Sequence, residues 1–338
     1  MNRFGSQFNI SLFGESHGSA VGIVIDGVKP GLPLSETDFE ADIARRRSGA
    51  TGTTPRREPD LPEILSGVYE GHTTGAPLAL VFRNTNTHSE DYELFKKMPR
   101  PGHVDYVAGV KFGGYEDPRG GGHFSGRMTL PLVAAGVVAK KMLPYTFTTS
   151  VIELGGSADP SAWPALLEAA SQEGDSLGGI VECRISGVPA GLGEPFFDTV
   201  ESLVSHLVFA IPGVRGVEFG DGFASARMKG SEHNDPLAPS TQSASPIPSF
   251  PGLSRESTLL PLSSHAGGVN GGLTNGGAVV FRVAFKPASS IRRPQRTWNV
   301  ALGREDTLVC PGRHDTCIAL RGAVVVEAAA AIVFADLL

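Results

Sequence analysis

The 338-residue sequence has only three cysteines, Cys183, Cys310 and Cys317, and no two of them form a CxxC pair. A small, odd number of widely spaced cysteines argues against a disulfide scaffold and against a cysteine zinc site. An HExxH pattern is also missing, and the carboxylates are scattered along the chain. The sequence therefore predicts no metal site.

Long apolar runs are missing as well. The most apolar stretch, residues 323–338, is interrupted by Glu327 and Asp336 and is too short to cross a bilayer. The first 18 residues contain no apolar segment of signal-peptide length. We therefore expect a cytoplasmic protein that makes no contact with a membrane.

Charged residues make up only 19% of the chain, and the formal net charge is −6. A protein that binds nucleic acid is more often basic, so nucleic acid is not the expected partner. Because a guanidinium group matches the geometry of phosphate and carboxylate, clustered arginines in an acidic protein indicate a small anionic ligand. Such arginines stand beside glycine, serine, threonine and proline at 45–47, 56–57, 119, 292–293 and 313.

Glycine, in contrast, is abundant, at 43 of 338 residues. Part of this excess belongs to a pattern that occurs twice in the same order. The turn, strand and turn of residues 14–32 return at 174–192, and two further pairs of segments follow, namely 71–83 with 272–283 and 127–143 with 321–337. Repeated order predicts an internal duplication, with halves of roughly 1–150 and 160–338 in a single domain of 1–338.

The two segments that follow Arg127 and Arg321 are rich in alanine and valine and apolar nearly all round. Such segments form helices that are buried on every side. Pro131 is compatible with the first helix only if it lies in the first turn. Paired strands and buried helices together favour an α+β fold, a layered β-α-β sandwich whose Ala/Val-rich helices lie between sheets.

Residues 231–264 are rich in serine and proline and have no hydrophobic period. A run of this length without periodicity is typical of a functional loop or a linker. We expect a mobile loop at the active site or at a subunit contact, and a disordered insertion is the alternative.

Three histidines stand in turns rather than on apolar faces: His17 in FGESHG, His103 in RPGHVDY and His314 in GRHD. In the second copy of the duplicated turn, Leu177 takes the place of His17. The scaffold does not need an imidazole there, which favours a chemical role for His17.

Two further segments are typical of anion binding. The run PRGGGHFSGR at 118–127 leads into the first buried helix, where backbone amides bind anions and Ser125 would add a hydroxyl. A plain flexible turn is the alternative reading. Residues 286–290, KPASS, combine a cation, a fixed turn and two hydroxyls, and the glycines of 265–277 would let a flat ring lie against the backbone.

Between residue 13 and about residue 327, a series of short motifs resembles the motifs of the chorismate synthase family and follows the same order. The series is FGESHG, RRRSG, TPRREPD, RPGHVDY, a GGG–Ser–Arg turn, HAGG, KPxSS and GRHD. The resemblance implies a duplicated β-α-β sandwich that assembles as a homotetramer. It implies a carbon–oxygen lyase of the shikimate pathway, which converts 5-enolpyruvylshikimate 3-phosphate to chorismate and phosphate by 1,4-anti elimination. The cofactor would be reduced FMN without net redox change, with NADPH only as a flavin reductant.

The resemblance also implies roles for single residues. His17 would protonate the departing phosphate, and His103 would act near the reduced flavin. Asp315, with the flavin, would remove the ring proton, while Ser16 and Ser125 would support the proton network. Substrate anions would be held by Arg45, Arg46, Arg119 and Arg127, and Arg46 also falls at a position for reduced nucleotide.

The positions that the resemblance implies for FMN lie on several segments. At two of them, His123 and Phe124, the sequence departs from the Arg-Ser of the family's usual glycine turn. The full set is His123, Phe124, Ser125, Pro212, Gly213, Gly271, Lys286, Pro287, Ala288, Ser289, Ser290 and Arg313.

Two other functions stay open at the level of sequence. One is a flavin-dependent oxidoreductase on the same scaffold, which would oxidise its flavin rather than release phosphate. The other is a non-catalytic protein that binds flavin or an anion, and such a protein would not need His17, His103 and Asp315 together.

Overall fold

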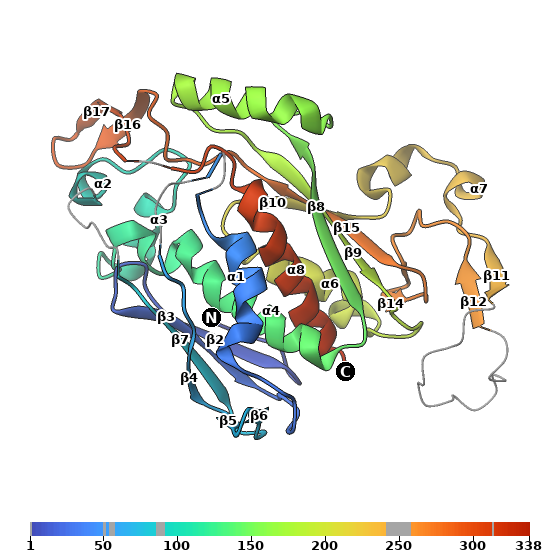
Figure 1. Cartoon of the computed structure of the whole chain (residues 1–338). Coiled ribbons are helices and arrows are strands. Elements are labelled where there is room, and N and C mark those ends of the chain that lie inside the picture. Colours follow the sequence, from blue (N-terminus) through green and yellow to red (C-terminus); the bar gives the residue numbers. More distant parts are fainter. Residues whose placement is uncertain (1, 50–51, 54–57, 86–91, 241–257, 313) are drawn as a thin grey trace.

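The N-terminal half of the chain forms an antiparallel sheet (Figure 1). The computed structural model describes residues 2–49, 52–53, 58–85, 92–240, 258–312 and 314–338. In β3, side chains at alternate positions, Val21, Ile23 and Ile25, are fully buried, as the period of a strand requires. The strand order is β1 (Arg3–Phe4), β2 (Asn9–Gly14), β3 (Ala20–Asp26), β7 (Leu78–Arg83) and β4 (Glu63–Ser66).

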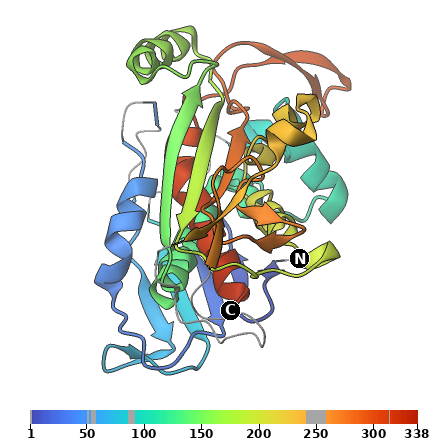
Figure 2. The same cartoon turned by 90° about the vertical axis from the view of Figure 1, so that its right-hand side faces the viewer.

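The C-terminal half forms a second antiparallel sheet. Alternate side chains of β9, Val181, Cys183 and Ile185, are fully buried, as in β3. The strand order is β10 (Val214–Phe219), β15 (Val279–Phe285), β9 (Gly179–Ser186) and β8 (Thr146–Leu154). Figure 2 shows the strands of this sheet, coloured green to orange, in front of the red helix α8.

Two apolar helices, α4 (Thr129–Met142) and α8 (Ala319–Asp336), pack against each other. α4 lies on strands β2, β3 and β7, and α8 lies on β8 and β9. Gly136 faces Ala328 so closely that a side chain at this glycine would overlap it. Both helices are buried nearly all round, and Pro131 is the third residue of α4, so the composition predicted these helices correctly.

Shorter elements complete the two halves. α1 (Glu40–Arg46) follows the 3₁₀ turn η1 (Glu36–Phe39) and packs on α4 and α8. α6 (Val200–Val208) follows η6 (Phe196–Asp198) and packs on α8 and β10. The others are β5 (Val68–Tyr69), β6 (His72–Thr73), α2 (Glu93–Lys97), α3 (Asp105–Phe112), η3 (Arg119–Phe124), η4 (Gly126–Met128), η5 (Pro160–Ala162), α5 (Trp163–Glu173), η7 (Gly222–Arg227), α7 (Gly230–His233), β11 (Leu237–Ser240), β12 (Thr258–Pro261), β13 (Val269–Asn270), β14 (Leu273–Thr274), β16 (Gln295–Asn299) and β17 (Arg304–Leu308).

Matching positions in the two halves make matching hydrogen bonds. Oγ1 of Thr73 accepts from the backbone N–H of Leu32 at 2.9 Å, and Oγ1 of Thr274 accepts from that of Leu192 at 2.9 Å. Each threonine ends a two-residue strand of a small hairpin, β5–β6 or β13–β14. The hydrophobic core contains residues of both halves, so the two sheets and their helices share one interior.

The described ends of the segment 231–264 differ from the expected loop. Residues 231–233 belong to α7, and strands β11 and β12 pair antiparallel, with Leu237 opposite Pro261. The expectation of a run without secondary structure is therefore wrong for these ends. Proline is tolerated because this sheet has only two strands, so each strand has a free edge. Residues 241–257 lie outside the described residues.

No helix in the described part of the chain is both long enough and apolar enough to span a membrane.

Candidate functional site

A cavity of about 1120 Å³ lies where the two halves of the chain meet. Its wall includes the glycine turn before α4, the end of α6 with the loop into β10, the loop 286–290 except Pro287, and His314, Asp315, Ile318 and Arg321. Sites for one drug-sized ligand usually measure ~300–1,000 Å³. The cavity therefore has room for more than one small molecule.

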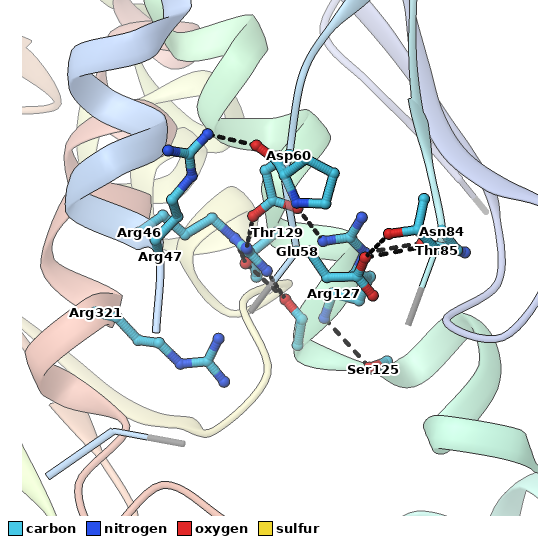
Figure 3. A network of polar contacts seen from close by, with 12 residues as sticks. Arg46, Arg47, Glu58, Asp60, Asn84, Thr85, Ser125, Arg127, Thr129 and Arg321 are labelled. Atoms are coloured by element: carbon cyan, nitrogen blue, oxygen red, sulfur yellow. Dashed lines mark hydrogen bonds and ion pairs between the residues drawn. The ribbon is translucent and has the colours of Figure 1, made fainter. Parts of the chain in front are cut away.

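Buried arginines form one side of this cavity (Figure 3). Arg46, in the last turn of α1, donates from Nε to Oγ1 of Thr129 at 2.9 Å and from a terminal nitrogen to the carbonyl of Gly126 at 2.9 Å. Asp60 forms an ion pair with Arg127 and lies 3.7 Å from Arg46. These three charged side chains are at most 6% exposed, so protein contacts fix their positions.

The charges around Arg46 do not balance. The pKa of Arg46 is lowered to about 9, chiefly by burial and also by the positive charges of Arg321 and Arg127, while Asp60 and Asp315 oppose the change. Arg46 thus stays protonated at neutral pH. Three guanidinium groups face two carboxylates, which leaves an excess of positive charge that a bound anion would neutralise.

Asp315 is held by Arg321, which belongs to the first turn of α8. Nε of Arg321 donates to Oδ2 of Asp315 at 3.0 Å, and both residues line the cavity. Figure 3 shows Arg321 coming from α8 on the side opposite Arg127 and Ser125. His314 also lines the cavity, and burial lowers the pKa of this imidazole.

His103 lies in the cavity wall with a fixed orientation. Its Nδ1 is 2.6 Å from Oδ1 of Asp105. The carboxylate of Asp105 also accepts two hydrogen bonds from the Arg100 side chain, one at each oxygen. Burial alone would raise the pKa of Asp105, but the hydrogen bonds from Arg100 and His103 outweigh it and hold that pKa well below its usual range. Asp105 is therefore a carboxylate that directs Nδ1 of His103 away from the cavity and leaves Nε2 for a ligand.

The loop 286–290 is joined to the loop that carries His103. Nζ of Lys286 donates to the carbonyl of Gly102 at 2.6 Å and to Oγ of Ser289 at 2.6 Å. Oγ of Ser290 accepts from Arg100 at 3.0 Å. Lys286, Ala288, Ser289 and Ser290 all line the cavity.

The glycine turn before α4 allows the backbone to approach His17 and Ser16. Gly120 has φ +61°, and a Cβ at this position would lie 2.5 Å from Cδ2 of His17 and 2.7 Å from Oγ of Ser16. Gly120 lines the cavity, whereas His17 and Ser16 lie directly behind it. His17 is 7% exposed and packs edge-on against Tyr92, with ring centroids 5.0 Å apart.

Further residues named from the sequence also line the cavity: His123, Phe124, Ser125, Pro212 and Gly213. Nδ1 of His123 donates to the carbonyl of Gly14 at 2.8 Å, and this contact anchors the turn to the end of β2. Oγ of Ser125 accepts from the backbone N–H of Arg127 at 3.2 Å.

Six of the named residues do not reach the cavity wall: His17 and Ser16, which lie behind Gly120, and Arg45, Arg119, Gly271 and Pro287. Arg45 binds Glu327 of α8 at 2.7 Å, because that carboxylate is only 4% exposed and needs a cation. Arg119 pairs with Asp117 at 2.8 Å and is not among the lining residues. Gly271 lies in the β13–β14 turn, and Pro287 lies in the loop that follows β15. Arg313, Arg56 and Arg57 lie outside the described residues.

Sequence reasoning missed several residues of this site: Asp60, Arg100, Asp105, Arg215 and Arg321. Arg321 was detectable, because the duplicated pattern aligns it with Arg127. Asp105 was detectable as the carboxylate two residues after His103. Within the described residues, no group of three or more His, Cys, Asp or Glu side chains is arranged to hold a metal ion.

A family model described as "Chorismate synthase" matches residues 8–338. The chain belongs to the chorismate synthase family. The resemblance drawn from the sequence motifs is thereby confirmed.

Relatives in the chorismate synthase family match over nearly their whole length. The chain is 52% identical to the chorismate synthase of Chitinophaga pinensis, over 99% of the chain and 96% of that protein. It is 43% identical to that of Korarchaeum cryptofilum, over 98% of the chain and 96% of that protein. A solved structure entitled "Crystal Structure of Chorismate Synthase" superposes with a TM-score of 0.71 at 24% identity, covering 99% of this chain and 92% of that one. This superposition shows a common mixed helix-and-strand fold.

Proposed function

We propose that the protein eliminates phosphate from 5-enolpyruvylshikimate 3-phosphate in a 1,4-anti reaction that gives chorismate. It does so with reduced FMN and without net oxidation, as a carbon–oxygen lyase of aromatic biosynthesis. One observation carries the proposal: a single cavity gathers Arg46, Arg127 and Arg321 with His103 and Asp315. A chain of the chorismate synthase family with these groups in one place has the parts that the reaction requires.

The arginines match the charges of the substrate. It carries one phosphate and two carboxylates, and each is a good acceptor for a guanidinium fork. Arg46, Arg127 and Arg321 line the cavity with more positive charge than Asp60 and Asp315 neutralise. In a site with little water, these charges would hold the substrate in one orientation and stabilise phosphate as it departs.

The cavity also fits a flavin. About 1120 Å³ is enough for FMN beside a small acid, and the glycines of η3 present bare backbone to a flat ring. Oγ of Ser16, buried behind Gly120, has no hydrogen-bond partner among the described residues, as expected where a ligand completes the site. When bound, reduced FMN supplies electron density that helps to break the carbon–oxygen bond.

Three residues would move protons. Asp315, which accepts a hydrogen bond from Nε of Arg321, would accept the ring proton. His103, held through Nδ1 by Asp105, would present Nε2 near the flavin. His17 would protonate the leaving phosphate from behind Gly120, where the absence of a side chain lets the imidazole lie close to the turn that lines the cavity.

We also propose that the two halves derive from one duplicated unit, arranged as a β-α-β sandwich. The matching strand orders and the paired contacts of Thr73 and Thr274 support this. The chain would assemble as a homotetramer, and light scattering of the purified protein would test this.

The experiment that tests the function is anaerobic incubation with the substrate and photoreduced FMN, followed by assays of phosphate and chorismate. We expect equal amounts of both products with reduced FMN and neither with oxidised FMN. A further sample with oxidised FMN and NADPH tests whether the protein reduces its own flavin. Absence of chorismate with reduced FMN would refute the proposal.

A further inference from the structure

A second cavity, of about 270 Å³, adjoins the first. Ser290, His314 and Asp315 line both cavities and therefore form the partition between them. The remaining wall of the second cavity includes α5, residues 174–175 and residues 291–292. Of all these residues, the proton transfers proposed above use only Asp315.

The second cavity is suited to hold water. Residues with hydroxyl or carboxylate side chains belong to its wall, among them Ser171, Asp175 and Thr316, and the cavity is not closed off from solvent. One water molecule occupies ~30 Å³ of liquid, so several fit, and a polar cavity of this size is expected to be hydrated. Water there would adjoin the two titratable residues of the partition, His314 and Asp315.

Asp315 needs a path by which it can lose a proton. In the proposed function it accepts the ring proton once in each turnover, and it must be a carboxylate again before the next. Its side chain is only 9% exposed, and it accepts a hydrogen bond from Nε of Arg321 at 3.0 Å. When substrate and flavin fill the first cavity, bulk water cannot reach Asp315 from that side. The second cavity adjoins Asp315 from another side.

His314 has a ring nitrogen that can accept a proton. Its Nε2 lies 3.0 Å from the carbonyl oxygen of Pro311. Since a carbonyl oxygen can only accept, Nε2 carries a hydrogen, and in the neutral ring Nδ1 carries the lone pair. Nδ1 has no hydrogen-bond partner among the residues that the structure describes. It is therefore open to a neighbouring acid or to water.

The surroundings of His314 suit a residue that holds a proton only briefly. Its pKa is lowered, chiefly by burial; the positive charges of Arg100 and His103 act in the same direction, against the carbonyl of Pro311 and the carboxylate of Asp315. Imidazole is ordinarily a stronger base than a carboxylate, so the ring can take a proton from a protonated aspartate. The lowered pKa then favours release of that proton to water.

We propose that His314 relays the proton accepted by Asp315 to water in the second cavity, and thereby to solvent. The O–H bond of protonated Asp315 breaks as an N–H bond forms at Nδ1 of His314, and this N–H bond then breaks to give hydronium in the second cavity. Asp315 is left as a carboxylate, and no group is oxidised or reduced. The inference rests on the proposed function, since it takes Asp315 as the acceptor of the ring proton.

The test compares steady-state rates of the unaltered chain, His314→Gln and His314→Ala at saturating reduced FMN. Loss of the relay predicts a kcat that is ~10-fold or more lower, with an unchanged KM for the substrate and a larger decrease of rate in D2O, because proton release limits turnover. Imidazole added to His314→Ala should restore part of kcat without competing with the substrate, since it enters through the second cavity.

The matched control is His72→Ala, which should leave kcat unchanged. His72 also has a ring nitrogen 3.0 Å from a backbone carbonyl, that of Glu70, but it lines neither cavity. Thermal melting of each variant checks the fold.

Unchanged kcat in both His314 variants would overturn the inference while leaving the proposed function intact. A lower kcat with an unaltered isotope effect and no rescue by imidazole would also overturn it, because it would show a structural role. Rescue that competes with the substrate would place imidazole in the first cavity and contradict the second cavity as the route. If the unaltered chain forms no chorismate, the proposed function fails together with the inference.

Discussion

Arg127 and Arg321 occupy matching places in the two halves of the chain, and both line one cavity. Arg127 lies in the 3₁₀ turn just before α4, and Arg321 lies in the first turn of α8. Each is paired with a carboxylate, Asp60 for Arg127 and Asp315 for Arg321. The packing of α4 against α8 therefore brings two guanidinium groups to the same cavity.

The pair of Arg127 and Asp60 yields a prediction on stability. Arg127→Met leaves Asp60 buried without its close partner, so the free energy of unfolding should fall by ~3 kcal/mol or more. The double variant Arg127→Met, Asp60→Asn should regain part of it, because Asn tolerates the positive φ of 48° at this position. Urea unfolding measures the free energy of unfolding of the unaltered chain, the single variant and the double variant.

The matched control for this prediction is Arg296→Met, which breaks an exposed ion pair and should cost less than ~1 kcal/mol. If Arg127→Met cost no more than this control, Asp60 would not depend on Arg127.

Gly120 should be required for catalysis through His17. In Gly120→Ala the new Cβ would displace His17 and Ser16, so turnover should fall by ~10²-fold or more, as in His17→Ala, while FMN still binds. The control is Gly114→Ala, because Gly114 also has positive φ, +81°, but nothing lies within 4 Å of its Cβ. Steady-state assays with FMN titration compare the three variants.

Both alanine variants bear the same type of backbone strain, ~1–2 kcal/mol. Equal activity of Gly114→Ala and Gly120→Ala would mean that the contact with His17 has no role.

Asp105 should make stability depend on pH. Its pKa in the folded chain lies well below the ~3.9 of an unfolded aspartate. A depressed folded pKa stabilises the fold above the unfolded value, and this contribution is lost as pH falls from about 5 toward the folded pKa. Asp105→Asn should therefore lose less stability than the unaltered chain between about pH 5 and pH 2.

Thermal melting across this range measures the difference. Asp198→Asn serves as the control, because Asp198 is exposed and outside the ion pairs of the described residues. Parallel curves for the unaltered chain and Asp105→Asn would contradict the assignment of the Arg100–Asp105–His103 contacts.

Substrate affinity should fall as salt rises. Ions screen the attraction between the arginine-lined cavity and a highly charged acid, so the dissociation constant should rise several-fold between about 0.05 and 0.5 M salt. Riboflavin carries no charge and should bind equally well at both concentrations. A flat response for the substrate, measured by calorimetry, would argue against Arg46, Arg127 and Arg321 as its ligands.

Much of the fold could be predicted from local pattern. The Ala/Val composition of α4 and α8 predicts burial because no face of either helix is polar. The repeated order of turns and strands predicts two sheets in which corresponding strands lie in the same order. The segment 231–264 was harder, because the pairing of β11 with β12 joins residues on either side of a long Ser/Pro-rich stretch.

The site was only partly predictable, because pairing in space decides which charges face a ligand. Arg45 and Arg46 are neighbours in sequence, yet Arg45 binds Glu327 and Arg46 faces the cavity. No pattern in the sequence separates them, since Glu327 lies 282 residues away. Arg215 was hidden for another reason: it is the extra residue of a bulge in β10, which a regular alternation of residues does not reveal.

The most direct test of the account is the ratio of phosphate released to flavin oxidised under anaerobic conditions. A small amount of photoreduced FMN is mixed with the protein and excess 5-enolpyruvylshikimate 3-phosphate, while flavin absorbance and phosphate are followed together. The account predicts many phosphates for each FMN, with the absorbance still that of reduced flavin at the end. One flavin oxidised for each substrate consumed, or no phosphate at all, would contradict it.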